Sequence, residues 1–214
     1  MIKVSPSMLA CDFTKYGQEI EKITKAGAEY VHLDVMDGVF VPNLSFGLPL
    51  IEAARKVTDA VLDVHLMIVE PERYIKQFSD AGADIIVFHY EATNNHQEII
   101  DTIHSLGKKA GMSIKPGTPT FVLEPFMKSL DLVLIMSVEP GFGGQKLIPE
   151  TLDKVSQVKE MRQLLGADFE IEIDGGITVD NAHLAVEAGV DVIVAGSAVF
   201  KAENPAAVIN SFKE

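Results

Sequence analysis

The decapeptide AGAEYVHLDV (Ala26–Val35) returns in altered form as AGADIIVFHY (Ala81–Tyr90) and AGVDVIVAGS (Ala188–Ser197). In each copy an Ala-Gly pair stands where a helix should end, and an acidic residue and a run of apolar residues follow it. Glycine readily takes the left-handed conformation that ends a helix, and apolar runs rich in Val and Ile are typical of strands buried on both faces. Each copy is therefore predicted to be a helix end that leads into a parallel strand.

The spacing of the three copies predicts how many such units the chain holds. Their glycines, Gly27, Gly82 and Gly189, lie about one quarter and then about one half of the 214-residue chain apart. If each quarter holds two strand–helix units, the chain holds eight, the number that closes a (β/α)8 barrel, or TIM barrel. We predict an α/β protein with a single parallel eight-stranded barrel over residues 1–214. The alternative is a doubly wound open α/β sheet.

Short apolar runs alternate with amphipathic segments along the whole chain, as expected for strands joined by helical crossovers. The expected strands are Val4–Leu9, Tyr30–Val35, Val61–Met67, Asp84–His89, Lys109–Ile114, Leu130–Val138, Phe169–Asp174 and Asp191–Gly196. The expected helices include Thr14–Lys25, Glu72–Asp80, His96–Leu106, Pro149–Leu164 and Asn181–Glu187.

The composition is that of a globular protein. Hydrophobic residues make up 47% and charged residues 23% of the chain. The net charge of −13 disfavours binding to nucleic acid and to anionic lipid. The single cysteine, Cys11, excludes an intramolecular disulfide. No secretory signal or apolar stretch of about 20 residues is visible, so we expect a soluble cytoplasmic protein that binds neither nucleic acid nor membranes.

Four polar residues at predicted strand ends are candidate metal ligands. His32 and Asp34 share one face of the second strand, His65 lies near the end of the third, and Asp174 ends the seventh. Because functional side chains of a barrel gather at the carboxyl ends of its strands, these four can converge. One His-x-Asp pair alone would more often be a hydrogen-bonded core pair. Two imidazoles and two carboxylates together favour a divalent metal such as zinc, manganese or iron(II).

Other ionisable residues near these strand ends are interpreted as supporting groups. Asp63 shares a face with His65 and is expected to orient it. Glu172 lies deeper in its strand and is expected to have a structural role. His89, next to Glu91 in FHYEA, could line the site but is not counted as a ligand. The other three histidines fall on predicted helices and are expected on outer faces: His96, His104 and His183.

Three glycine-rich turns follow late strands: EPGFGGQ (Glu139–Gln145), DGGI (Asp174–Ile177) and AGSAVF (Ala195–Phe200). Glycine lets backbone N–H groups approach a ligand, and barrels often hold phosphate at the turns after strands seven and eight, beside a short helix. No Lys or Arg lies within these turns, and Lys146 stands just beyond the first, so capture of phosphate by the backbone is predicted. Three methionines at strand ends are either core filler or an apolar lining over the metal site, and their shared position favours the lining: Met36, Met67 and Met136.

These motifs coincide with those of a known family, since the chain resembles ribulose-phosphate 3-epimerases over nearly its full length. The turn KPGTP (Lys115–Pro119) is similar to the family's turn after the fifth strand. The other matching pieces, in order, are SPSMLACDF, HLDVMDGVFVPN, DVHLMI, MSVEPGFGGQ, EIDGGI and AGSAVF.

The resemblance implies a reaction, the interconversion of D-ribulose 5-phosphate and D-xylulose 5-phosphate in the pentose phosphate pathway. It implies two-base proton transfer at C3 through a metal-stabilised enediolate, with Asp34 and Asp174 as the acid/base pair. The implied cofactor is one divalent cation on His32, Asp34, His65 and Asp174, with zinc the first choice and iron, manganese or cobalt as alternatives. Family members often form homo-oligomers, which we expect here too. The implied substrate contacts are Ser7, His65, Gly141, Phe142, Gly143, Gly144, Asp174, Gly175, Gly176, Gly196 and Ser197.

Three other functions are weighed against this expectation. A D-allulose-6-phosphate 3-epimerase would share the barrel and the metal ligands but act on a substrate one carbon longer. A metal-free phosphate-binding isomerase or synthase would share the glycine turns without needing the four ligands. A non-catalytic sugar-phosphate binder would bind ligand without turnover, although both acid/base carboxylates are present. Assays of metal content and of turnover separate these cases.

Overall fold

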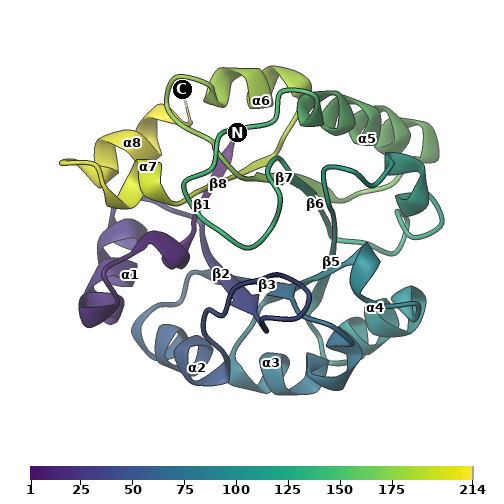
Figure 1. Cartoon of the computed structure of the whole chain (residues 1–214), viewed down its shortest axis with the longest axis horizontal. Coiled ribbons are helices and arrows are strands. Elements are labelled where there is room, and N and C mark those ends of the chain that lie inside the picture. Colours follow the sequence, from purple (N-terminus) through teal and green to yellow (C-terminus); the bar gives the residue numbers. More distant parts are fainter. Residues whose placement is uncertain (214) are drawn as a thin grey trace.

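The computed structural model describes residues 1–213, and its eight strands form one parallel sheet that curves into a barrel (Figure 1). The hydrogen-bonded order runs β1-β8-β7-β6-β5-β4-β3-β2, and a parallel bridge between Ser7 and His32 joins β1 to β2. The predicted (β/α)8 barrel is confirmed and the open sheet is wrong. The strands are β1 Lys3–Pro6, β2 Tyr30–Met36, β3 Val61–Met67, β4 Ile85–His89, β5 Lys109–Ile114, β6 Leu132–Met136, β7 Glu170–Asp174 and β8 Val192–Ala195.

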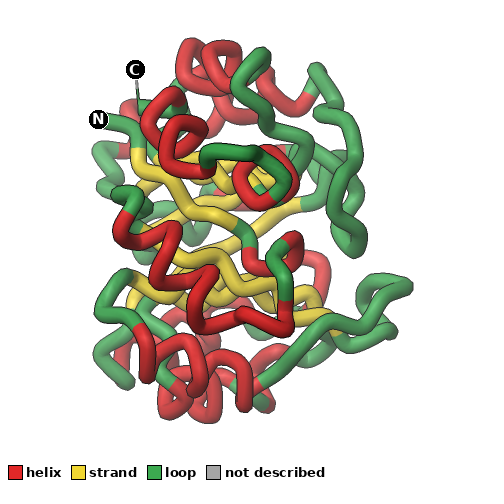
Figure 2. Tube along the Cα trace, turned by 90° about the vertical axis from the view of Figure 1, so that its left-hand side faces the viewer, coloured by secondary structure: helices red, strands yellow, loops and turns green. Residues whose placement is uncertain are grey.

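Helices surround the strands on the outside of the barrel (Figures 1 and 2). They are α1 Tyr16–Lys25, α2 Leu48–Val57, α3 Ile75–Ala81, α4 His96–Ser105, α5 Thr151–Leu165, α6 Ala182–Ala188, α7 Ser197–Phe200 and α8 Pro205–Ser211. Short 3-10 helices occupy several connections, and the one between β5 and β6 stands where another unit has its α-helix. They are η1 Met8–Ala10, η2 Phe13–Lys15, η3 Pro71–Arg73, η4 Tyr90–Ala92 and η5 Thr120–Leu123. In the described part of the chain, no helix is long and apolar enough to cross a membrane.

The repeated Ala-Gly pairs end helices or helical turns, as predicted. Gly27, Gly82 and Gly189 have φ angles of +98°, +113° and +113°, all in the left-handed region. At two of these positions a side chain would also collide with a neighbour. A Cβ on Gly82 would lie 2.7 Å from the side chain of Arg55, and one on Gly189 would lie 2.4 Å from that of Lys159. Glycine is therefore required at the end of α3 and of α6, where the chain turns back toward the next strand.

The interior of the barrel is divided into an apolar and a polar part. A cluster of buried apolar side chains fills the first part and comes chiefly from β4, β6 and β8: Tyr30, Ile85, Val87, Leu132, Leu134, Met136, Val138 and Val192. The polar part includes Ser5, His32, Asp63 and Glu172, which are buried on β1, β2, β3 and β7. Burying ionisable groups is unfavourable unless they are paired or bind a metal. The polar part therefore needs a bonding network, and it lies directly below the carboxyl ends of the strands.

Candidate metal centre and active site

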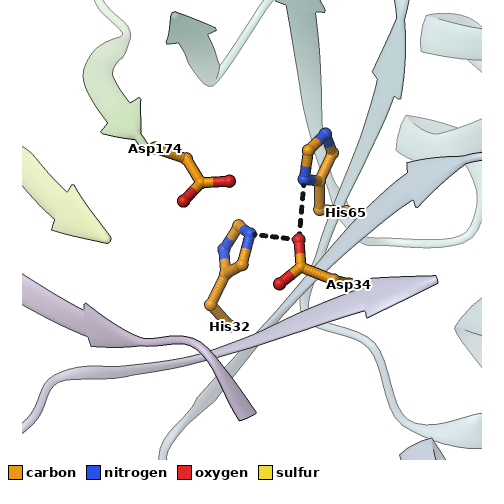
Figure 3. Close-up of side chains that lie close together, drawn as sticks. All are labelled: His32, Asp34, His65 and Asp174. Carbon is orange, nitrogen blue, oxygen red and sulfur yellow. Dashed lines mark hydrogen bonds and ion pairs between the residues drawn. The ribbon is translucent and has the colours of Figure 1, made fainter. Parts of the chain in front are cut away.

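The four residues predicted as metal ligands converge at the carboxyl end of the barrel (Figure 3). Each offers a nitrogen or oxygen atom, and these atoms all lie within 4.8 Å of one another. His32, Asp34 and His65 are buried on β2 and β3, whereas Asp174 is half-buried at the end of β7. The geometric prediction from strand ends is therefore correct, and the metal-binding role stays a prediction.

Asp34 is the centre of this cluster. Its Oδ1 lies 3.2 Å from His32 Nε2 and 3.1 Å from His65 Nδ1. Its Oδ2 accepts a hydrogen bond from the Ser7 hydroxyl at 2.5 Å. Two features of the sheet bring these groups together. The register of β2 and β3 pairs Asp34 with His65, and a bridge joins Ser7 to His32. One carboxylate thus holds two imidazoles in fixed positions.

Asp63 orients His32, not His65 as the sequence had suggested. His32 Nδ1 lies 2.5 Å from Asp63 Oδ2, which the Ser5 hydroxyl also contacts at 3.3 Å. Residues two apart in one strand are about 6.6 Å apart along it, whereas residues facing each other across two strands are about 4.8 Å apart. Since Asp63 stands opposite His32 in the register, the neighbour across the sheet is the closer partner.

The bonding of His32 fits a metal ligand. With its Nδ1–H donated to Asp63, its Nε2 carries a lone pair, and this buried atom has no hydrogen-bond partner in the described structure. Two acceptors, His32 Nε2 and Asp34 Oδ1, face each other across 3.2 Å, so a proton or a cation must lie near both. Burial lowers the pKa of His32, but the charges of Asp34 and Asp63 outweigh it and raise that pKa well above the ordinary value. The raised pKa favours a proton at this place when no metal is bound, and a metal would displace that proton.

The two carboxylates of the cluster have opposite pKa shifts. Burial acts to raise the pKa of Asp34, but His32 and His65 outweigh it and hold that pKa well below the ordinary range. Burial and the charge of Asp34 raise the pKa of Asp174 to about 6. Environments that push the pKa values of paired carboxylates apart are typical of a base and an acid that work together.

The raised pKa of Asp174 predicts a pH-dependent stability of the metal-free protein. The folded protein holds this proton more tightly than the unfolded chain, because the pKa is about 6 in the folded state against an ordinary 3.8. The stabilising contribution is therefore present at low pH and lost as pH rises from about 4 to about 6. Asn at this position does not titrate. We expect the Tm of metal-free Asp174→Asn, relative to wild type, to rise over that interval, measured by thermal unfolding with chelator; a flat difference would contradict the shift.

Glu172 lies below Asp174 in the same strand and is fully buried, as predicted. Burial and the charge of Asp63 raise the pKa of Glu172 well above its ordinary value. The shift favours the uncharged form of Glu172 beneath the candidate metal centre.

A cavity of about 570 Å³ opens above the cluster. Asp34, Asp174 and Ser7 reach its wall, while His32 and His65 lie fully buried beneath it. The three methionines predicted as an apolar lining do line it: Met36, Met67 and Met136. Its volume lies in the range of pockets for small molecules, with the carboxylates at its floor.

The three glycine-rich turns meet on one side of the cavity. Gly175 and Gly176 have φ angles of +122° and +67°. A Cβ on Gly176 would lie 2.2 Å from the backbone N of Leu147, and one on Gly144 would lie 4.0 Å from Ser197 Oγ. The loop after β6 therefore packs against both the end of β7 and the start of α7. All of the glycines predicted to contact substrate line the cavity, together with Phe142 and Ser197: Gly141, Gly143, Gly144, Gly175, Gly176 and Gly196.

A basic residue that sequence reasoning missed, Lys201, also lines this cavity. It directly follows α7, the short helix that starts at Ser197 after the N-cap Gly196. Lys146, the cation noted in the sequence, is not among the cavity-lining residues of the described chain. Lys201 lies four residues after Ser197, about one helical turn. This spacing places the two residues on the same side only if the segment is a helix, and a helix here was not among those expected from the sequence.

The other histidines divide into buried and exposed groups. His89 is fully buried and stands behind His65, with 2.9 Å between their Nε2 atoms, so it does not line the cavity. His96 was wrongly expected on an outer face. It is half-buried, and its Nε2 bonds to the Tyr90 carbonyl at 2.8 Å. The two histidines that are exposed on helices, as predicted, are His104 and His183.

Comparison with known proteins identifies close relatives. The model described as the ribulose-phosphate 3 epimerase family matches residues 3–200. The ribulose-phosphate 3-epimerase of Bacillus subtilis (strain 168) is 51% identical, over 94% of this chain and 93% of that protein. The Synechocystis protein of the same name is 49% identical over 97% and 91%, and that of Schizosaccharomyces pombe is 45% identical over 99% and 92%.

Solved structures of lower sequence identity share the barrel. KGPDC from Streptococcus mutans superposes with a TM-score of 0.77 at 15% identity, over 100% of this chain and 96% of that one. The 3-hexulose-6-phosphate synthase of Salmonella typhimurium gives 0.76 at 15% identity, over 99% and 96%. A mutant tryptophan synthase α-subunit from Pyrococcus furiosus gives 0.72 at 13%, over 100% and 96%. At such identities the likeness shows the fold alone.

Proposed function

The chain belongs to the ribulose-phosphate 3-epimerase family, and from this premise we propose that it interconverts D-ribulose 5-phosphate and D-xylulose 5-phosphate by metal-dependent, two-base proton transfer at C3. The observation that carries the mechanism is the pair Asp34 and Asp174. Their pKa values shift in opposite directions, and both reach the floor of one cavity.

Four side chains would hold the divalent metal: His32, Asp34, His65 and Asp174. The mixed nitrogen and oxygen donors suit zinc first, with iron, manganese or cobalt as alternatives. When bound, the cation supplies a Lewis acid that polarises the substrate's ketone. The contact of His32 Nε2 with Asp34 Oδ1 at 3.2 Å supports this assignment, because both atoms are acceptors when His32 donates its Nδ1–H to Asp63.

Inversion at a carbon beside a ketone requires a proton to leave one face and another to arrive at the opposite face. Asp34, whose pKa is low, accepts the first proton, and Asp174, whose pKa is raised to about 6, donates the second. The roles exchange in the reverse reaction. The two carboxylates come from β2 and β7, which are not neighbours in the barrel, and enter the site from different sides (Figure 3).

The substrate's phosphate would bind at the glycine turns that line the cavity. Backbone N–H groups around Gly144, Gly176 and Ser197 can point at an anion there. Lys201 adds a local positive charge. Together they would overcome the repulsion that a chain of net charge −13 exerts on a phosphate. The three methionines that line the cavity would keep bulk water away from the reacting carbon: Met36, Met67 and Met136.

The test is a coupled assay of purified, metal-analysed protein with D-ribulose 5-phosphate and with D-allulose 6-phosphate. We expect fast turnover of the pentose phosphate that a chelator abolishes and added zinc restores. Turnover of the hexose phosphate alone would move the chain to the other epimerase branch. Full activity in metal-depleted, chelator-treated protein would contradict the proposed metal dependence. No turnover of either substrate by metal-loaded protein would contradict the proposed epimerase activity.

A further inference from the structure

Two side chains that the proposed mechanism does not use lie in line behind His65: His89, which is fully buried, and Glu91, which is half-buried. The outer nitrogen of His65 points away from the other three ligands (Figure 3) and lies 2.9 Å from His89 Nε2. His89 Nδ1 in turn lies 3.2 Å from Glu91 Oε2. The ring centroids are 5.0 Å apart and the ring planes are inclined by 29°, and the 2.9 Å between the two nitrogens suits a hydrogen bond.

The direction of these hydrogen bonds follows from what a metal ligand needs. A metal on His65 Nδ1 requires a lone pair there, so the hydrogen of the neutral ring is on Nε2. That N–H faces His89 Nε2, which must accept. His89 then carries its own hydrogen on Nδ1, and this N–H needs an acceptor. Glu91 Oε2 is the partner in place.

Glu91 is held as an acceptor by the backbone N–H of Lys115, which can only donate. Its Oε1 accepts the backbone N–H of Lys115 at 2.8 Å and the hydroxyl of Thr118. Burial acts to raise the pKa of Glu91, but the hydrogen bonds from His89, Thr118 and Lys115 outweigh it and lower that pKa to about 2. A carboxylate offers no hydrogen to His89, so Glu91 is the final acceptor in the series of hydrogen bonds from His65 through His89.

We infer that His89 and Glu91 are positioning residues, which set the tautomer and the ring orientation of His65 from outside the metal centre. Asp63 orients His32 by a direct hydrogen bond. Glu91 orients His65 through His89, by two successive hydrogen bonds. The inference rests on the proposed metal centre, because only a metal ligand needs the lone pair on Nδ1.

The test is the isosteric variant Glu91→Gln. Its carbonyl oxygen stays with the Lys115 N–H, so its amide NH₂ turns toward His89 Nδ1 and reverses each hydrogen bond. His65 then carries its hydrogen on Nδ1, where the metal must bind. We expect zinc affinity, measured by competition with a chromophoric chelator, to fall about 10- to 100-fold, the usual cost of losing a group that supports a ligand. ¹⁵N NMR of the imidazoles should show the hydrogen on His65 Nε2 in zinc-loaded wild type and its displacement in the variant.

The matched control is Glu72→Gln, which removes the same charge nearby. Glu72 accepts a hydrogen bond from Asn95 at 3.0 Å, and it has no histidine partner among the hydrogen bonds of residues 1–213. It should bind zinc like wild type. Loss of charge alone could weaken binding in Glu91→Gln, but it would not move the hydrogen of His65, so the NMR readout separates the two causes.

Unchanged zinc affinity and an unchanged His65 tautomer in Glu91→Gln would overturn the inference while leaving the metal centre intact. A hydrogen on His65 Nδ1 in zinc-loaded wild type would overturn it as well. Wild-type protein that binds no divalent metal would instead overturn the proposed metal centre itself. If Glu91→Gln does not fold, His89→Gln and His89→Leu decide. Gln can accept from His65 and donate to Glu91, so it should retain more zinc affinity than Leu, and equal affinities would contradict the inference.

Discussion

Replacing Asp34 by asparagine is expected to lower kcat by at least about 10²- to 10⁴-fold, the usual contribution of one positioned acid/base group. The loss of kcat should be larger for Asp34→Asn than for Asp174→Asn, because Asp34 also holds other groups of the site in position. Its Oδ1 faces two imidazoles, and its Oδ2 accepts from Ser7. An amide carries no charge to hold these nitrogens or a metal. We expect bound zinc to decrease together with kcat, measured on the same preparation.

The control for Asp34→Asn is Asp168→Asn, the same chemical change at an exposed residue that does not line the active-site cavity. Its kcat and zinc content should match wild type. If Asp34→Asn turned over ribulose 5-phosphate at a rate near that of wild type, with its metal present, Asp34 would not be the base.

Asp174→Asn is expected to lower epimerisation by about 10²- to 10⁴-fold, and the loss should be asymmetric in a way that identifies the two-base mechanism. Asp34 remains and can still remove the C3 proton from the epimer that presents it on that side. In deuterated water this variant should exchange the C3 hydrogen of one epimer without converting it, and leave the other epimer unlabelled. NMR of both substrates at C3 measures the exchange.

Exchange of both epimers by Asp174→Asn, at rates well above its epimerisation rate, would mean that one base serves both faces. Loss of exchange in both, with zinc still bound at the wild-type level, would mean that Asp174 is needed for the first proton transfer too. Asp168→Asn again provides the control, with exchange and epimerisation like those of wild type.

The sequence alone was sufficient for the barrel and for the convergence of the four residues of the candidate metal centre. Alternation along a strand places residues two apart on one face, so the spacing of His32 and Asp34 was enough to assign them to the same side. The repeated Ala-Gly-acidic pattern counted the units, and Gly82 and Gly189 do adopt the left-handed conformation that the pattern requires. Two helices, α2 and α8, were not among those expected from the sequence.

Contacts between segments were decided by the tertiary structure. Asp63 bonds to His32 rather than to His65 because the register between β2 and β3 sets the shortest distance. Lys201 reaches the cavity because α7 starts at Ser197. Glu91 in η4 accepts hydrogen bonds from Lys115 and Thr118, which follow β5. Alternation along a strand determines on which face of the sheet a side chain lies, because this face depends only on the backbone of that strand. Which atoms meet across elements depends on how all eight strands close into one ring, and that is a property of the whole barrel.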